Sequence, residues 1–222
     1  MHILIVSATP FEVAPTVEWL EDVGPLSDEL SIEFLVAGIG QVATAYALGR
    51  RLADVSRPVD LLIQVGIAGS FDHQLPLGSV VYVNSDRMAD LGAEAATGKF
   101  LDLKEIGLTY PAPCNASNGA LRIPTLPYRA LHDLPWVAGL TVNQASGSDA
   151  SIEALRLRFP TITVETMEGA AAAFAAVSSE TDFVHLRGIS NYVTARDRES
   201  WRIGEAVEAV NEVVQDLLKK LT

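Results

Sequence analysis

Along the first third of the chain, short apolar segments alternate with segments whose apolar residues recur at the spacing of an α-helix. A helix is predicted over residues 10–22, disturbed at Pro15, and another over residues 41–55. Uninterrupted apolar strands separated by helices are typical of a sheet that helices cover on both faces. The predicted strands of this part are residues 2–7, 31–37, 59–65 and 79–83.

The same alternation returns after a less regular middle. Residues 84–136 carry five of the eleven prolines, which predicts long connections of the kind that form lids or subunit contacts. Strands are then predicted at 140–144, 161–165 and 183–187, and helices at 150–158, in the alanine-rich segment after Glu168, and at 199–221. The pattern predicts an α/β fold: a single domain over residues 1–222, with three α/β/α layers and a mostly parallel, mixed central sheet.

Composition narrows the classes of partner. With 222 residues, 49% of them hydrophobic, the chain can bury one large core, and its net charge of −12 disfavours nucleic acids and anionic membranes as partners. A small-molecule ligand is expected. Cys114 is the only cysteine and no Cys/His cluster has metal-ligand spacing, so neither a metal nor another cofactor is expected. The first residues resemble a strand and not a signal peptide, which favours a cytoplasmic location.

Polar or glycine-rich segments follow four of the predicted strands. Because the carboxyl ends of parallel strands meet at one rim of a sheet, these segments are expected to form a single pocket. At the third of them an extended run turns into the alanine-rich helix, with Glu165 and Glu168 at the junction. These two carboxylates either complement the helix dipole or face the crevice above the sheet. The four segments are residues 7–12, 66–70, 165–168 and 187–191.

The motifs in these segments, taken in order, resemble the purine nucleoside phosphorylase/nucleosidase superfamily, and its hydrolytic branch most closely. They are Ala8-x-x-x-Glu12-Val13, Gly38-Ile39-Gly40, Gly66-x-Ala68-Gly69, Met167-Glu168 and Arg187-x-Ile189-Ser190. Within that branch, the 165–169 junction, the 188–192 segment and Arg198-x-x-Trp201 are similar to the family of futalosine hydrolases, which serve an alternative menaquinone pathway.

The resemblance implies cleavage of a purine N-glycosidic bond, which builds positive charge on the ribose. Such a reaction needs a positioned water, groups that hold the sugar hydroxyls, and a polar contact to the leaving base. By position, Glu12 is the expected base for the water with Arg187 nearby, Glu168 binds the ribose hydroxyls, and Asn191 addresses the purine. The other expected substrate contacts are Met167 against the sugar, Gly40, Gly66, Ile67, Ala68 and Gly69.

Each of these residues also has a purely structural interpretation. Glu12 stands where a capping box places a glutamate, Met167 is a common core residue, and Arg187 could pair with a surface acid. The short glycine spacings are weak signals on their own, because ordinary turns share them. His185, inside an apolar strand, is assigned to the core and given no role in catalysis.

Two positions depart from nucleosidases of the methylthioadenosine type. Those enzymes usually have serine at the position of Ile67 and aspartate at that of Asn191. An asparagine can donate to a 6-oxo group while its carbonyl accepts from a protonated N7, which favours a 6-oxopurine. The expected function is hydrolysis of futalosine to hypoxanthine by a homo-oligomer, either a dimer or a dimer of dimers. The alternatives are another nucleosidase or phosphorylase of this fold, and a non-catalytic nucleoside-binding protein.

Overall fold

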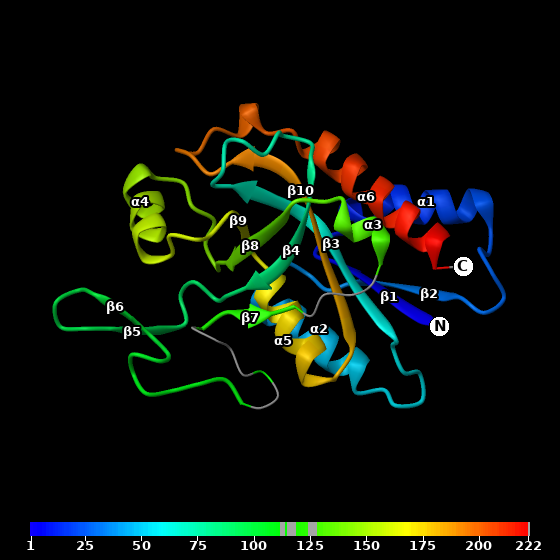
Figure 1. The fold of residues 1–222 in the computed structure, drawn as a ribbon, viewed down its shortest axis with the longest axis horizontal. Helices are drawn as coiled ribbons and strands as arrows, with labels where there is room; N and C mark the ends of the chain where they lie inside the picture. The colour runs from blue at the N-terminus through cyan, green and yellow to red at the C-terminus, as the bar shows by residue number, and fades with distance from the viewer. Residues whose placement is uncertain (112–113, 115–118, 124–127, 222) are drawn as a thin grey trace.

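The centre of the molecule is a mixed sheet that closes on itself. In the computed structural model, which describes residues 1–111, 114, 119–123 and 128–221, eight described strands form this sheet in the order β10-β4-β8-β9-β3-β1-β2, with β7 paired to β4. They are β1 (His2–Ser7), β2 (Ser31–Val36), β3 (Leu61–Ser70), β4 (Val80–Asp86), β7 (Leu121–Arg122), β8 (Trp136–Thr141), β9 (Val164–Thr166) and β10 (Asp182–Tyr192). A separate hairpin, β5 (Gly92–Glu94) and β6 (Phe100–Asp102), projects beyond it (Figure 1).

Strand β3 is the element that closes the sheet. One edge of β3 pairs first with β1, in parallel, and then with β9, antiparallel, while the other edge pairs in parallel with β10 along its whole length. Because β10 continues through β4 and β8 back to β9, five strands form a barrel-like ring and β1 and β2 extend from it. The carboxyl ends of β3 and β10 therefore lie side by side.

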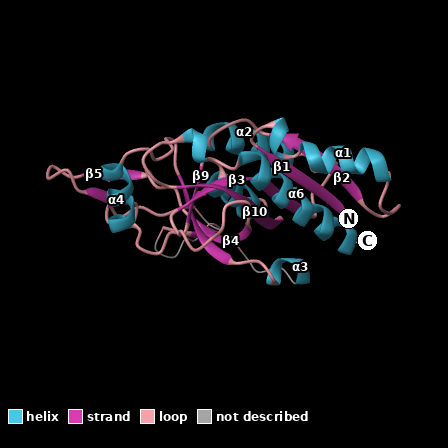
Figure 2. Ribbon diagram, turned by 90° about the horizontal axis from the view of Figure 1, so that it is seen from above, coloured by secondary structure: helices cyan, strands magenta, loops and turns pink. Residues whose placement is uncertain are grey.

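Helices cover both faces of the sheet. α1 (Ala14–Val23) packs with α6 (Ile203–Lys220) on one face, and α2 (Gln41–Leu52) packs with α5 (Gly169–Ser178) on the other (Figures 1 and 2). Most side chains of α5 are buried alanines, which let that helix approach the sheet closely. The predicted three-layer α/β class with a mixed sheet is confirmed. The short elements are α3 (Arg129–His132), α4 (Asp149–Arg158) and the 3₁₀ turns η1 (Pro10–Glu12) and η2 (Arg198–Ser200).

Several predicted element boundaries were wrong. The helix predicted at 10–22 is divided into η1 and α1, and Pro15 lies in the first turn of α1, where its missing N–H costs nothing. The segments 66–70 and 187–191, expected to lie past their strands, belong to the second halves of β3 and β10, which pair with each other there. Strand β9 pairs with the other edge of β3 at the same point. The strand predicted at 140–144 begins earlier, since Trp136 pairs with Tyr82 of β4.

The irregular middle of the chain is only partly described. Elements β5, β6, β7 and α3 belong to it, and the remaining described residues there are connections. Pro113, Pro124 and Pro127, on which part of the prediction of long connections depends, lie outside the described residues. No helix in the described part of the chain is long and apolar enough to cross a membrane.

Candidate active site

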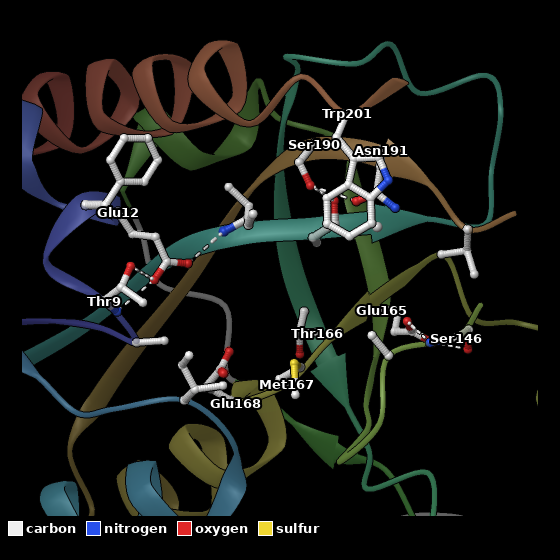
Figure 3. A pocket seen from close by; sticks show the side chains of 18 residues that line it. Thr9, Glu12, Ser146, Glu165, Thr166, Met167, Glu168, Ser190, Asn191 and Trp201 are labelled. Carbon is white, nitrogen blue, oxygen red and sulfur yellow. Dashed lines mark hydrogen bonds between the residues drawn. The ribbon is translucent and has the colours of Figure 1, made fainter. Parts of the chain in front are cut away.

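A cavity of about 270 Å³ lies where β3, β9 and β10 end (Figure 3). Of the ten residues that the sequence predicted for the site, all of which the structure describes, seven line this cavity: Glu12, Ile67, Ala68, Gly69, Met167, Glu168 and Asn191. The other three, Gly40, Gly66 and Arg187, lie directly behind its wall and contact the carboxylates. The four segments expected to converge do so.

The carboxylate of Glu12 is fixed by three donors. It stands in η1, and its Oε2 accepts hydrogen bonds from the backbone N (2.9 Å) and the Oγ1 (3.0 Å) of Thr9. Its Oε1 accepts from the backbone N of Ile67 on β3 at 3.3 Å. The capping box is therefore real, and the same carboxylate lines the cavity. Capping and a role at the site are compatible here, because capping holds Glu12 in one direction.

Arg187 is buried in β10 beneath the cavity. Its Nη1 donates to the backbone O of Ile67 at 3.3 Å and lies 3.8 Å from Glu168 Oε2. A Cβ on Gly66, the position paired with Arg187, would collide with that guanidinium and come within 2.7 Å of Glu12 Oε1. Only glycine leaves room at this point for a cation and a carboxylate.

Glu168 joins two helices at the cavity. It is the residue before α5, and its Oε1 accepts a hydrogen bond of 2.9 Å from the backbone N of Gly40, the residue before α2. Gly40 has φ +88°, a conformation that favours glycine. The N-terminus of α2 and the guanidinium of Arg187 therefore hold this carboxylate from two sides.

Asn191 lies at the opposite end of the cavity from Glu12 (Figure 3). A bulge in β10 between Ile189 and Asn191 shifts the register, so that Asn191 pairs with Gly69. The hydroxyl Oγ of Ser190 lies 2.8 Å from Asn191 Oδ1, and Asn191 Nδ2 donates to the backbone O of Tyr192 at 3.0 Å. One N–H and one lone pair of this fixed amide remain for a ligand.

Sequence reasoning missed several residues of the cavity wall. Ser146 donates to Glu165 twice, from its backbone N at 2.9 Å and from its hydroxyl at 2.5 Å, and both residues line the cavity. Burial raises the pKa of Glu165, and the Ser146 hydrogen bonds oppose that rise. Trp201 also lines the wall. Ser146 follows β8 at the same rim as the predicted segments. Its position after a predicted strand was the one signal in the sequence that could have indicated a place in the site.

Five aromatic side chains of the sequence that could contact a substituent on the ribose 5′ carbon lie elsewhere. Phe71, Phe100, Tyr110, Tyr128 and Tyr192, all of them described, are absent from the wall of this cavity. The apolar side chains of the wall instead include Phe11 and Ile39, which are 56% and 65% exposed.

His185 connects Arg187 to a second buried acid. Its Nε2 accepts a hydrogen bond of 2.8 Å from Arg187 Nε, and its Nδ1 lies 3.8 Å from Asp86 Oδ2. Burial, followed by the Arg187 charge, lowers the pKa of His185 well below 6.5, and burial raises the pKa of Asp86 to about 7. The imidazole is therefore neutral. His185 is fully buried, as its assignment to the core implies, and it holds one side of the guanidinium.

Among the described residues, no three His, Cys, Asp or Glu side chains come together in a way that could hold a metal ion. The cavity brings together three fixed carboxylates, those of Glu12, Glu165 and Glu168, and the amide of Asn191, with one buried guanidinium behind its wall.

Comparison with known proteins places this arrangement in a family. The model of the phosphorylase superfamily matches residues 2–222. The futalosine hydrolase of Streptomyces coelicolor is 36% identical over 191 residues, which are 83% of this chain and 77% of that protein. The solved futalosine hydrolase of Helicobacter pylori aligns with a TM-score of 0.80 at 16% identity, covering 99% of this chain and 98% of that one.

A third similar structure is the 5′-methylthioadenosine/S-adenosylhomocysteine nucleosidase of Neisseria meningitidis in complex with methylthio-immucillin-A. It aligns with a TM-score of 0.79 at 19% identity over 99% of both chains, which shows a common fold. The resemblance found in the sequence is confirmed by the match over the whole chain and by the identity with the Streptomyces protein. The chain belongs to the phosphorylase superfamily and, within it, to the family of futalosine hydrolases.

Proposed function

We propose that the protein hydrolyses the N-ribosidic bond of futalosine and releases hypoxanthine. The observation that carries the proposal is the single cavity with two fixed carboxylates, Glu12 and Glu168, near one end and the amide of Asn191 at the other. A nucleoside is arranged in the same way, with a sugar at one end and a purine at the other. The relatives named futalosine hydrolase support the choice of substrate.

In the proposed reaction Glu12 orients a water and accepts its proton as the oxygen bonds to C1′. The bond between C1′ and the purine breaks, and its electron pair leaves with the base. The departing purine takes up one proton from solvent, and Glu12 returns its proton to solvent. One water is thereby divided between the new sugar hydroxyl and neutral hypoxanthine. Glu12 suits this role because three donors fix its direction while it remains at the cavity wall.

Glu168 is proposed to bind the ribose 2′ and 3′ hydroxyls. A carboxylate that accepts from these hydroxyls is most stabilising when the sugar is cationic, so it lowers the barrier and not only the energy of the bound substrate. Arg187 helps to keep the Glu168 carboxylate in place, with 3.8 Å between Nη1 and Oε2. Met167, at the wall between the two ends, is proposed to lie against the sugar.

The test is to incubate the protein with futalosine, inosine and methylthioadenosine, with and without phosphate, and to identify the products. Hypoxanthine from futalosine, together with a sugar bearing a free 1′ hydroxyl, is the expected result with or without phosphate. A sugar 1-phosphate as the main product would instead show a phosphorylase. Preferential cleavage of methylthioadenosine would show a nucleosidase for 6-aminopurines, and binding without turnover would show a nucleoside-binding protein.

A homo-oligomer is also proposed. Phe11 and Ile39 at the cavity, and Val42 and Tyr46 on α2, are large apolar side chains that are more than half exposed. An apolar patch that continues from the mouth of a site is a common interface between copies of a chain. Light scattering coupled to gel filtration checks this, and a monomer at working concentration would contradict it. The cytoplasmic location stays a prediction.

A further inference from the structure

The pair formed by Glu165 and Ser146 has no role in the function proposed so far. Glu165 is only 8% exposed, yet it lines the cavity, and Ser146 holds both of its carboxylate oxygens. A buried carboxylate loses the hydration that stabilises its charge, so its place in the wall of a binding cavity requires an explanation. Figure 3 shows the pair at the far side of the cavity from Glu12.

The sheet places Glu165 in one row with Asn191. Gly69 of β3 pairs with Glu165 of β9 on one edge and with Asn191 of β10 on the other. Residues directly paired across strands carry their side chains on the same face of a sheet. Glu165 and Asn191 therefore flank Gly69 on the cavity side, at two interstrand spacings, or roughly 10 Å, between their backbones.

Gly69 has no side chain of its own between them. A Cβ at this position would lie 3.0 Å from Val193 Cγ2 and 3.1 Å from Asn191 Nδ2, so both of these side chains reach over the glycine, and both line the cavity. With polar hydrogen-bonding groups on both sides and the apolar Val193 between them, the row suits a flat ring with polar edges. A purine that meets Asn191 with one edge presents its next edge toward Glu165.

The two kinds of purine differ on that second edge. In a 6-oxopurine such as hypoxanthine, N1 carries a hydrogen and is a donor. In a 6-aminopurine such as adenine, N1 carries a lone pair and is an acceptor. An ionised carboxylate can only accept, so it matches the first and repels the second. A carboxylate with both oxygens held by Ser146 still has lone pairs available for one more donor.

We propose that Glu165, held by Ser146, is a specificity residue that accepts the N1–H of a 6-oxopurine, while Asn191 addresses the 6-oxo group and N7. The inference rests on the proposed function and extends it from one base contact to two. The competing role is structural: Glu165 would only anchor the loop that carries Ser146. Under that role the carboxylate would not distinguish donors from acceptors on a bound base.

The test measures the dissociation constants of hypoxanthine and adenine by calorimetry for the wild type and three variants. In Glu165→Gln the amide can donate to adenine N1, so the preference for hypoxanthine should fall about 10- to 100-fold. Ser146→Ala removes the hydroxyl hydrogen bond to Glu165 but keeps the backbone one and the carboxyl group, so it should weaken both bases and leave their ratio unchanged within about threefold. Glu153→Gln, on the exposed side of α4, is the matched control and should change neither constant.

A probe on the ligand side does not depend on any variant folding. 1-Methylhypoxanthine lacks the N1 hydrogen, so the wild type should bind it at least tenfold more weakly than hypoxanthine. Equal affinities, or a ratio that moves no further in Glu165→Gln than in Ser146→Ala, would overturn the assignment of Glu165. Failure of the proposed function is a separate result, because the wild type would then release no hypoxanthine from futalosine.

Discussion

The two ends of the cavity are built in different ways. At the end of Glu12 and Glu168, charged groups are held by backbone N–H groups and by a buried guanidinium, and these come from η1, α2, β3 and β10. At the end of Asn191 and Glu165, two serine hydroxyls, one backbone N–H and one carbonyl hold the polar groups, all within neighbouring strands and one loop. The first end suits charge that develops during a reaction, and the second suits the selection of a flat base.

Removing charge at the sugar end should have the largest effect. Glu12→Gln and Glu168→Gln are each expected to lower kcat by about 10²- to 10⁴-fold, because one removes the base for the water and the other weakens the contact to the cationic sugar. Steady-state kinetics with futalosine and thermal melts check this, with the exposed Glu18→Gln as control. Near-normal turnover of both variants would mean that neither carboxylate acts in the reaction.

Crowding the sugar end of the cavity should lower kcat less than removing one of its carboxylates does. In Gly66→Ala, the new Cβ displaces the Arg187 guanidinium and presses on Glu12. A displacement of about 1 Å can lower kcat about 100-fold. The matched control is Gly49→Ala in α2, where nothing lies within 4 Å of the added Cβ, so both activity and Tm should be retained. If Gly66→Ala turns over like Gly49→Ala, the close approach does not matter for catalysis.

A substitution at the base end of the cavity should change the preference between purines more than it changes kcat. Asn191→Asp preserves the shape of the side chain but sets an acceptor against the 6-oxo group. The ratio of kcat/KM for futalosine to that for its 6-amino analogue aminofutalosine should fall by about one to two orders of magnitude. Both constants are measured on the wild type and the variant. A ratio that stays constant would show that Asn191 does not contact the base.

Some parts of the fold could be predicted from local pattern. The apolar runs of β1 and β2, the helix α4 and the alanine-rich α5 depend on the spacing of apolar residues and on capping residues close in sequence. The segment 66–70 could not, because glycines next to an apolar run usually indicate a turn. Here two neighbouring strands extend β3 through it, and those pairings join residues more than 90 positions apart.

The candidate site also contains some residues that the sequence predicted and some contacts that it did not. Glu12, Glu168, Arg187 and Asn191 were predicted because each lies at the end of a predicted strand in a short segment that resembles the nucleosidases. The contact of Ser146 with Glu165 was not, because it depends on where a loop after β8 meets β9 in space.

The amino-acid sequence by itself determined the α/β class, the family and the residue types available for chemistry, because these follow from periodicity and short motifs. Only the tertiary structure decided which charges face one another. Gly66 leaves the space for Arg187 beside Glu12, and the register across Gly69 sets Glu165 and Asn191 on one face. These relations depend on strand pairing and close packing between distant segments, which no local pattern encodes.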